Sequence, residues 1–207
     1  MRCFVKLNFF TFPTMDLKIQ KYLLTVARSV IAGKLGLDEN EPGMPKGAAA
    51  SVLREKRGVF VTLEIGSRLR GCIGHIEGVL PLILGVRENA ESAAFKDLRF
   101  DPLSTEEFEE VGIEISVLSV PQKLASDGPE DLKSKLRPGV DGVVLTSGFA
   151  KATYLPQVWS EFPEDELKEK FLSSLCMKAG LDPEEWKKGE VKVETYQAEI
   201  FRDRGLF

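Results

Sequence analysis

Two strand-like runs joined by a two-residue turn constrain the fold of this chain more than any other feature. Residues 58–65 read GVFVTLEI and residues 68–76 read RLRGCIGHI, with Gly66-Ser67 between them. β-Branched and aromatic residues favour strands, and a glycine-containing dipeptide between two such runs favours a tight turn. The sequence therefore predicts an antiparallel β-hairpin over 58–76.

The position of this turn predicts which side chains share a face of the sheet. A regular register around it places Cys72 opposite Val61. Side chains alternate between the two faces of a strand, so Arg70, Cys72 and Gly74 are expected on one face and His75 on the other. A catalytic Cys–His pair needs hydrogen-bond reach. Because these two side chains point apart, the sequence argues against such a pair.

The remaining elements mix helices with further strands. Apolar spacing and capping residues predict helices over 17–35, 81–95 and 163–180, and shorter helices after residue 104 and over 128–136. Alternating patterns predict strands over 111–120, 141–156 and 190–201, the second being a hairpin that turns at Ser147-Gly148. This order predicts an α+β fold, with a largely antiparallel sheet, flanking helices and two lobes of unequal size.

The length of the chain, 207 residues, is that of one domain or of one domain with a smaller lobe. We interpret residues 16–207 as a single domain that can divide into two sub-lobes. Residues 1–15 are interpreted as an extension outside this domain, because the segment that starts at Met15 (MDLKIQKYLL) has the pattern of a helix start.

Charge and cysteine content narrow the classes of function. The net charge of −4 argues against sequence-independent nucleic-acid binding, which needs a basic face. Three widely spaced cysteines do not form a disulfide framework, so a cytoplasmic location is expected. The cysteines lack the close spacing of zinc ligands, and no stretch is long and apolar enough for a membrane span. We therefore expect no metal, no cofactor and no membrane partner.

Cys72 has two interpretations, which the sequence leaves open. A cysteine within a strand is commonly a small buried hydrophobic residue with an inert thiol. However, Gly71 and Gly74 flank it, and glycines inside strands often mark the close approach of a ligand or of another backbone. A neighbouring cation such as Arg70 would lower the pKa of an accessible thiol, as expected of a nucleophile.

Other polar residues stand at unusual positions. Asn89 lies at the margin of the apolar face of the helix over 81–95, where it is either a boundary residue or a contact to a ligand. Asp97 and Arg99 form either a local pair that fixes a loop or a site for an anion. In the strand over 111–120, Glu114 and Ser116 share one face, and Glu114 needs a partner or solvent, for which Arg70 or Arg99 is the natural candidate.

Several stretches together resemble the AMMECR family, named after a human chromosomal region. They run in order from residue 58 to residue 181: GVFVTL, LRGCIG, NAESAAFKDLRFDPLS, IEISVLS, GVDGVVL, YLPQVW and FLSSLCMKAGL. The resemblance implies a two-lobed fold with a groove bordered by the LRGCIG segment. It also implies partners in a modification pathway, namely Memo-like or radical-SAM proteins, and site residues at Arg70, Gly71, Cys72, Gly74, Asn89, Asp97, Arg99, Phe100, Glu114 and Ser116.

Three hypotheses for function follow. The first is binding of a nucleotide, RNA or other small anionic ligand in the groove, through Arg70, Arg99 and their neighbours. The second is an enzyme in which Cys72 is the nucleophile and Glu114 or Asp97 moves protons. The third is a protein-interaction adaptor. Sequence motifs for phosphate-binding loops, dinucleotide sites, zinc proteases and serine hydrolases are absent from the chain.

Overall fold

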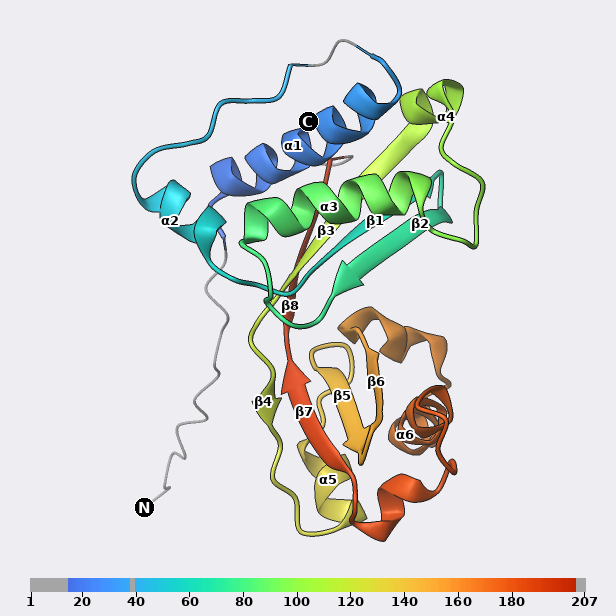
Figure 1. The fold of residues 1–207 in the computed structure, drawn as a ribbon. Coiled ribbons are helices and arrows are strands. Elements are labelled where there is room, and N and C mark those ends of the chain that lie inside the picture. Colours follow the sequence, from blue (N-terminus) through green and yellow to red (C-terminus); the bar gives the residue numbers. More distant parts are fainter. Residues whose placement is uncertain (1–14, 38–39, 204–207) are drawn as a thin grey trace.

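The computed structural model describes residues 15–37 and 40–203, and it has two lobes (Figure 1). The N-lobe comprises residues 15–118 and 198–203 of these ranges, and the C-lobe comprises residues 119–197. The proposed N-terminal extension lies outside the described residues except for Met15. The α+β fold and the antiparallel strand pairing predicted from the sequence are confirmed, and the strands form two sheets instead of one.

The N-lobe is a four-stranded antiparallel sheet in the order β2-β1-β3-β8 with helices against it. Its strands are β1 (Val59–Ile65), β2 (Arg68–His75), β3 (Val111–Leu118) and β8 (Ala198–Arg202). Its helices are α1 (Leu17–Lys34), α2 (Ala48–Arg54), α3 (Leu82–Phe95) and α4 (Thr105–Glu110).

The C-lobe is a second four-stranded antiparallel sheet, in the order β4-β7-β5-β6. Its strands are β4 (Gln122–Lys123), β5 (Gly142–Ser147), β6 (Ala150–Tyr154) and β7 (Lys192–Tyr196). Its helices are α5 (Pro129–Lys135), α6 (Leu167–Lys178) and the 3-10 helices η1 (Pro156–Glu161) and η2 (Glu185–Lys188). None of the helices in the described ranges combines the length and the apolar character needed to cross a membrane.

Helix ends follow the capping signals in the sequence. Asp16 caps α1 by accepting a hydrogen bond from the backbone of Lys18. Ser104 and Glu107 form a reciprocal capping box at the start of α4, which satisfies two backbone donors that the helix leaves open. These local interactions explain why the starts of α1 and α4 were predictable from the sequence. The start predicted at residue 163 is wrong, because α6 begins at Leu167 and no side chain caps it.

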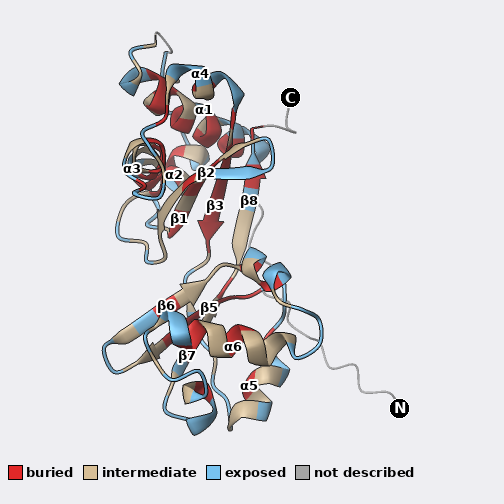
Figure 2. Cartoon of the chain, turned by 90° about the vertical axis from the view of Figure 1, so that its right-hand side faces the viewer, coloured by how far each residue is buried: buried red, intermediate tan, exposed pale blue. Residues whose placement is uncertain are grey.

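One face of the N-lobe sheet is covered by helices, and Figure 2 shows α1 and α3 on the same side of β1 and β3. The helix-facing residues of β1 are Val59, Val61 and Leu63, and all three are fully buried. The opposite side chains of the same strand are only half-buried. The sheet therefore has one apolar face packed on helices and one face, called here the open face, that the N-lobe helices leave uncovered, although Glu114 and Ser116 of β3 are buried on it.

The register predicted for the first hairpin is wrong beyond its turn. Glu64 pairs with Leu69 as expected, but Leu63 pairs with Gly71, so Arg70 is an extra residue in a β-bulge. The bulge shifts every later pair by one residue, and Cys72 lies opposite Thr62 instead of Val61. Cys72 consequently shares the open face with a hydroxyl group and not the core face with a valine.

The C-lobe core contains a group of packed aromatic rings among aliphatic side chains. The rings of Trp159 and Phe171 stack at a centroid distance of 3.5 Å with an interplanar angle of 5°. Tyr154 and Phe162 both pack edge-on against Phe171. The hairpin that contributes Tyr154 turns at Gly148-Phe149, one residue later than predicted. Its position still allows β6 to deliver Tyr154 to this aromatic cluster.

The strand predicted over 190–201 divides at Gln197 into β7 of the C-lobe and β8 of the N-lobe. The chain segment beside it divides in the same way, into β3 of the N-lobe and β4 of the C-lobe. β8 pairs with β3, and β7 pairs with β4. Ser119 and Gln197 link these two segments where they pass from one lobe to the other. The Ser119 N–H donates to the Gln197 carbonyl, and the Gln197 N–H donates to the Ser119 hydroxyl group. The C-lobe is thus an insertion between β3 and β8, joined to the N-lobe by two adjacent chain segments.

A small apolar cluster closes the junction between the lobes. Leu118 of β3, Val144 of β5 and Tyr196 of β7 are fully buried in it, and the side chain of Phe60 packs against them. Burial raises the pKa of Tyr196 to about 12, while its hydroxyl group donates to the backbone oxygen of Tyr154. The C-lobe therefore covers the lower end of the open face.

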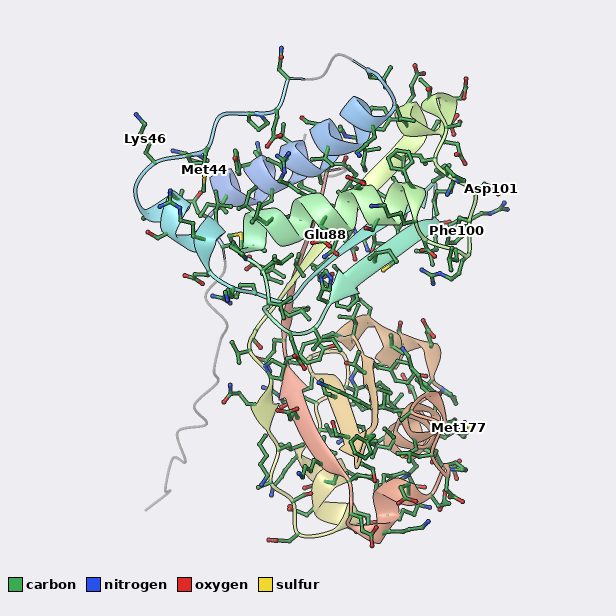
Figure 3. All side chains as sticks on the ribbon, viewed as in Figure 1. Met44, Lys46, Glu88, Phe100, Asp101 and Met177 are labelled. Atoms are coloured by element: carbon green, nitrogen blue, oxygen red, sulfur yellow. The ribbon has the colours of Figure 1, made fainter. Side chains whose placement is uncertain are left out.

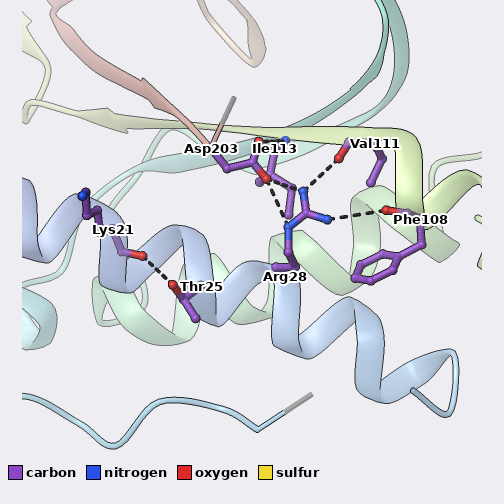
Figure 4. Close-up of polar contacts among 7 residues, drawn as sticks. All are labelled: Lys21, Thr25, Arg28, Phe108, Val111, Ile113 and Asp203. Atoms are coloured by element: carbon purple, nitrogen blue, oxygen red, sulfur yellow. Dashed lines mark hydrogen bonds and ion pairs between the residues drawn. The ribbon is translucent and has the colours of Figure 1, made fainter. Parts of the chain in front are cut away.

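An ion pair fastens the end of β8 to the first helix (Figure 4). The guanidinium group of Arg28 on α1 contacts the carboxylate of Asp203 and donates to the backbone oxygen of Val111 at 2.8 Å. Asp203 also accepts a hydrogen bond from the backbone of Ile113 at 2.9 Å. This network ties together the first helix, the start of β3 and the last described residue.

Candidate functional site

The side chain of Cys72 lies on the open face, half-buried beside Thr62. The hydroxyl group of Thr62 donates to Sγ at 3.3 Å. Burial is the largest influence on this thiol and raises its pKa, whereas the bond from Thr62 and the charge of Arg99 lower the pKa by less. This direction is opposite to the lowered pKa that a nucleophilic Cys72 requires.

Cys72 begins a polar row that crosses all four strands of the N-lobe sheet. Strand pairing places Cys72 beside Thr62, Thr62 beside Glu114, and Glu114 beside Arg202. We call these four residues the polar row. Three interstrand spacings of ~4.8 Å make the row roughly 14 Å long. It brings together a thiol, a hydroxyl, a carboxylate and a guanidinium group on one surface.

Glu114 is held by a partner that the sequence did not indicate. Nε of Arg202 donates to Oε2 of Glu114 at 2.5 Å, so the expected pairing with Arg70 or Arg99 is wrong. The side chain of Glu114 is 7% exposed, whereas that of Arg202 is 57% exposed. A buried carboxylate thus positions a guanidinium group that still faces solvent.

Asp97 and Arg99 occupy the outer edge of β2 and bind the backbone of Cys72. Oδ2 of Asp97 accepts from the Cys72 N–H at 2.9 Å, and Nη2 of Arg99 donates to the Cys72 carbonyl at 3.2 Å. The two side chains also pair with each other at 2.6 Å. They therefore satisfy the backbone groups that an edge strand leaves open, as a neighbouring strand would.

The Asp97–Arg99 pair has the same arrangement as the Glu114–Arg202 pair at the other end of the polar row. The carboxylate is 5% exposed and the guanidinium group is 56% exposed. Hydrogen bonds from Arg99 are the largest influence on Asp97 and hold its pKa far below the ordinary range. Both ends of the row thus carry a solvent-facing arginine that a buried carboxylate holds in place.

Arg70 lies in the bulge and contacts the loop that follows α3, and its predicted role in ligand binding stays a prediction. Its Nε and Nη2 donate to the two carboxylate oxygens of Glu107 at 2.7 and 2.8 Å, and Nη2 also donates to the Asp101 carbonyl at 2.9 Å. Its side chain is 12% exposed. Arg70 therefore fixes the loop, and Arg99 is the cation that acts on the Cys72 thiol.

This loop forms a pocket of about 630 Å³ at the edge of the N-lobe. The ring of Phe100 lies between two guanidinium groups, 5.5 Å from that of Arg99 and 5.8 Å from that of Arg70. Figure 3 labels Phe100 and Asp101 at this edge, and Leu98 is fully exposed beside them. The pocket combines a solvent-facing cation with an aromatic surface.

Gly71, Gly74 and Asn89 have packing contacts that explain their residue types. A Cβ on Gly71 would lie 2.1 Å from the backbone oxygen of Ala93, and one on Gly74 would lie 2.2 Å from the ring of Phe60. Asn89 is fully buried and donates to the backbone oxygen of Val59 at 2.9 Å. The spaces beside both glycines are filled by protein, and their role in ligand binding stays a prediction.

Three residues of this region escaped the sequence analysis. Thr62 and Arg202 complete the polar row, and Nε2 of Gln157 in the C-lobe approaches Oγ of Ser116 at 3.5 Å. Ser116 lies next to the polar row on the open face, so Gln157 brings the C-lobe to its border. The alternation of the last strand was the one available signal, because it places Arg202 on a definite face.

A two-lobed α+β fold with a polar row on an uncovered sheet face and a clamped edge strand defines the structural class of this protein. Among the described residues, no group of three potential ligand side chains is arranged to hold a metal ion. The chain belongs to the AMMECR1 family, whose model matches residues 24–201. The family resemblance inferred from the sequence is thus confirmed.

Relatives in archaea support this assignment. A protein of Methanothermobacter thermautotrophicus is 46% identical over 154 residues, covering 74% of this chain and 79% of that protein. Protein MJ0810 of Methanocaldococcus jannaschii is 37% identical over 185 residues, covering 88% and 87%. The crystal structure of the uncharacterised protein PH0010 from Pyrococcus horikoshii matches with a TM-score of 0.79 at 35% identity, covering 92% and 94%.

Proposed function

We propose that this protein binds an anionic ligand of the nucleotide class on the open face, between Arg99 and Arg202. The observation that carries the proposal is the repeated pair of a buried carboxylate and a solvent-facing guanidinium group at the two ends of the polar row. Guanidinium groups recognise phosphate and carboxylate well because their donors form a planar fork.

The two arginines are positioned before any ligand arrives. Asp97 and Glu114 each fix one side of the fork, which reduces the side-chain entropy lost on binding. Among the hydrogen bonds of the described residues, Nη1 of Arg99 donates to none, so it remains free for a ligand oxygen. Phe100 offers an aromatic surface next to Arg99, which suits a planar base.

Cys72 serves in this proposal as a neutral contact in the floor of the site. Its thiol accepts a hydrogen bond from Thr62, and burial raises its pKa, so the thiolate needed for nucleophilic attack is disfavoured. The alternative, an enzyme with Cys72 as nucleophile, requires that iodoacetamide label Cys72 faster in the folded protein than in the urea-unfolded protein. Slower labelling of the folded protein supports the binding function.

Calorimetric titration with AMP, ATP and a short single-stranded RNA tests the binding function. Truncation of one fixed guanidinium group is expected to weaken binding of the best probe about tenfold or more, because each charge-assisted contact contributes ~1.5–3 kcal/mol. Arg99→Ala and Arg202→Ala are the informative variants. Arg68→Ala is the matched control, since Arg68 is exposed at the hairpin tip of the same strand as Cys72.

Arg99→Lys keeps the charge but loses the fork, and it separates recognition geometry from net charge. We expect it to bind more weakly than the wild type and more tightly than Arg99→Ala. Circular dichroism confirms that each variant is folded. The proposal is overturned if none of the three probes binds, or if Arg68→Ala weakens binding as much as the two site variants.

A further inference from the structure

A second cleft lies between the two lobes, and none of the four residues of the polar row lines it. It has a volume of about 530 Å³ and opens beside the end of β2. The N-lobe contributes His75, Ile76, Glu77 and Val79, and the C-lobe contributes Lys151, Ala152, Thr153 and Lys178. Glu77 and Lys151 form an ion pair of 2.5 Å across it, so residues of both lobes meet at this point.

Lys178, at the last turn of α6, carries the free positive charge of this cleft. Met177, labelled in Figure 3, marks this end of the helix. Nζ of Lys178 lies 4.6 Å from the centre of the Tyr154 ring and donates to the backbone oxygen of Thr153 at 3.0 Å. Within the described ranges no carboxylate approaches Nζ to ion-pair distance, and Glu161 acts on it only from farther away.

The surroundings of Lys178 are unfavourable for an unpaired ammonium group. Partial burial lowers its pKa, which means that the charged form loses more hydration than its neighbours restore. The second lysine of the cleft differs in this respect, because Glu77 already neutralises Lys151. An anion placed against Nζ would supply the interaction that the protein itself does not provide.

The walls of the cleft determine what kind of anion fits. Ile76, Val79 and Ala152 present aliphatic groups, and Val79 is 55% exposed although it is apolar. Burial of apolar ligand surface against such groups is favourable by about 25 cal/mol per Å². The cleft offers a highly charged ligand one cation without an ion-pair partner and mostly apolar walls. A ligand with a single negative charge on an apolar body therefore fits the cleft better.

We propose that the cleft between the lobes binds a small organic monoanion with an apolar body, such as an aromatic or aliphatic carboxylate, whose anionic group pairs with Lys178. The ligand contacts both lobes at once. This site is independent of the polar row, because it differs in position, in lining residues and in the charge of the ligand that it selects.

Ligand-observed NMR titration with benzoate tests the proposal, with benzyl alcohol and acetate as comparison probes. Benzyl alcohol has the ring without the charge, and acetate has the charge without the ring. We expect benzoate to bind at least about tenfold more tightly than either comparison probe. The ring and the charge are each expected to contribute a factor of about ten to the affinity. Equal binding of benzoate and benzyl alcohol would show that Lys178 selects no anion.

Three variants locate the binding. Lys178→Met is expected to weaken benzoate about tenfold, and Val79→Asp, which adds a negative charge at an exposed wall residue, is expected to weaken it at least as much. Lys170→Met, on the same helix but outside the cleft, is the matched control and is expected to leave benzoate binding unchanged. The proposal fails if Lys178→Met and Val79→Asp are both folded and bind benzoate as the wild type does.

Discussion

The two lobes have sheets of the same size but different interiors. The N-lobe core is mostly aliphatic, and its sheet leaves one face without a covering helix. The C-lobe core is built around an aromatic stack, and β5 is buried on both faces, against the aromatic cluster on one side and the lobe junction on the other. The difference shows that the C-lobe sheet serves mainly for packing. The N-lobe sheet keeps one surface that is available for binding or chemistry.

Buried carboxylates pair with arginines in both lobes. In the N-lobe, Asp97 and Glu114 each hold a solvent-facing arginine at an end of the polar row. In the C-lobe, Asp141 binds Arg137 and also accepts from Gln197 at the crossing between the lobes. In the N-lobe, Asp203 likewise makes a connection through Arg28, so the pairs of the polar row differ from it in the greater exposure of their arginines.

The largest expected effect comes from breaking the aromatic core of the C-lobe. Phe171→Ala removes the ring that stacks on Trp159 and should lower the free energy of unfolding by about 3–5 kcal/mol. Urea unfolding followed by tryptophan fluorescence measures the loss. Hydrogen exchange then compares the lobes: protection is expected to fall mainly in β5 and α6, while equal loss in β1 would show that the lobes unfold as one unit.

An intermediate effect is expected where the N-lobe helix meets its sheet. Gly71→Ala would force a Cβ against the Ala93 carbonyl of α3, which should cost about 1–3 kcal/mol of stability. Thermal unfolding measures this change. Gly33→Ala in α1 is the control, since nothing lies within 4 Å of its added Cβ, and it should stabilise the protein by up to about 1 kcal/mol. Equal effects of both changes would contradict the tight contact between α3 and β2.

The smallest expected effect concerns the ion pair of the loop. The hydrogen bond from Arg70 lowers the pKa of Glu107 from 4.5 to about 2. A lowered pKa means that the ionised group stabilises the folded state above about pH 4.5, and that this contribution is lost as the pH falls toward 2. Urea midpoints at pH 3 and pH 7 are expected to differ less in Glu107→Gln than in the wild type. Glu110→Gln, on the same helix, should retain the wild-type difference.

Local features of the N-lobe were predictable from sequence because neighbouring residues determine them. The hairpin turn, the Ser104 cap and the local Asp97–Arg99 pair all depend on contacts within a few residues. The register was not predictable by alternation alone. A bulge at Arg70 is stabilised by Glu107, 37 residues away, and a strand pattern carries no sign of that partner.

Contacts that span the chain explain the remaining differences. Glu114 pairs with Arg202, 88 residues later, and no spacing rule links them. The alternation over 190–201 continues through Gln197, so the sequence gives no sign that the chain passes from one sheet to another there. Only half of the polar row was therefore predictable from the sequence. Cys72 and Glu114 were candidate site residues, whereas Thr62 and Arg202 were identified from the strand pairing.

The insertion of the C-lobe between β3 and β8 has a consequence for synthesis on the ribosome. β1, β2 and β3 emerge first, the whole C-lobe follows, and β8 emerges last. Until then the nascent N-lobe exposes the edge of β3, and an unpaired strand edge readily associates with other chains. A product that stops before residue 198 would retain Cys72, Thr62 and Glu114 but lack both the final arginine of the row and the strand that shields this edge. Such a fragment should aggregate and not accumulate as a smaller functional protein.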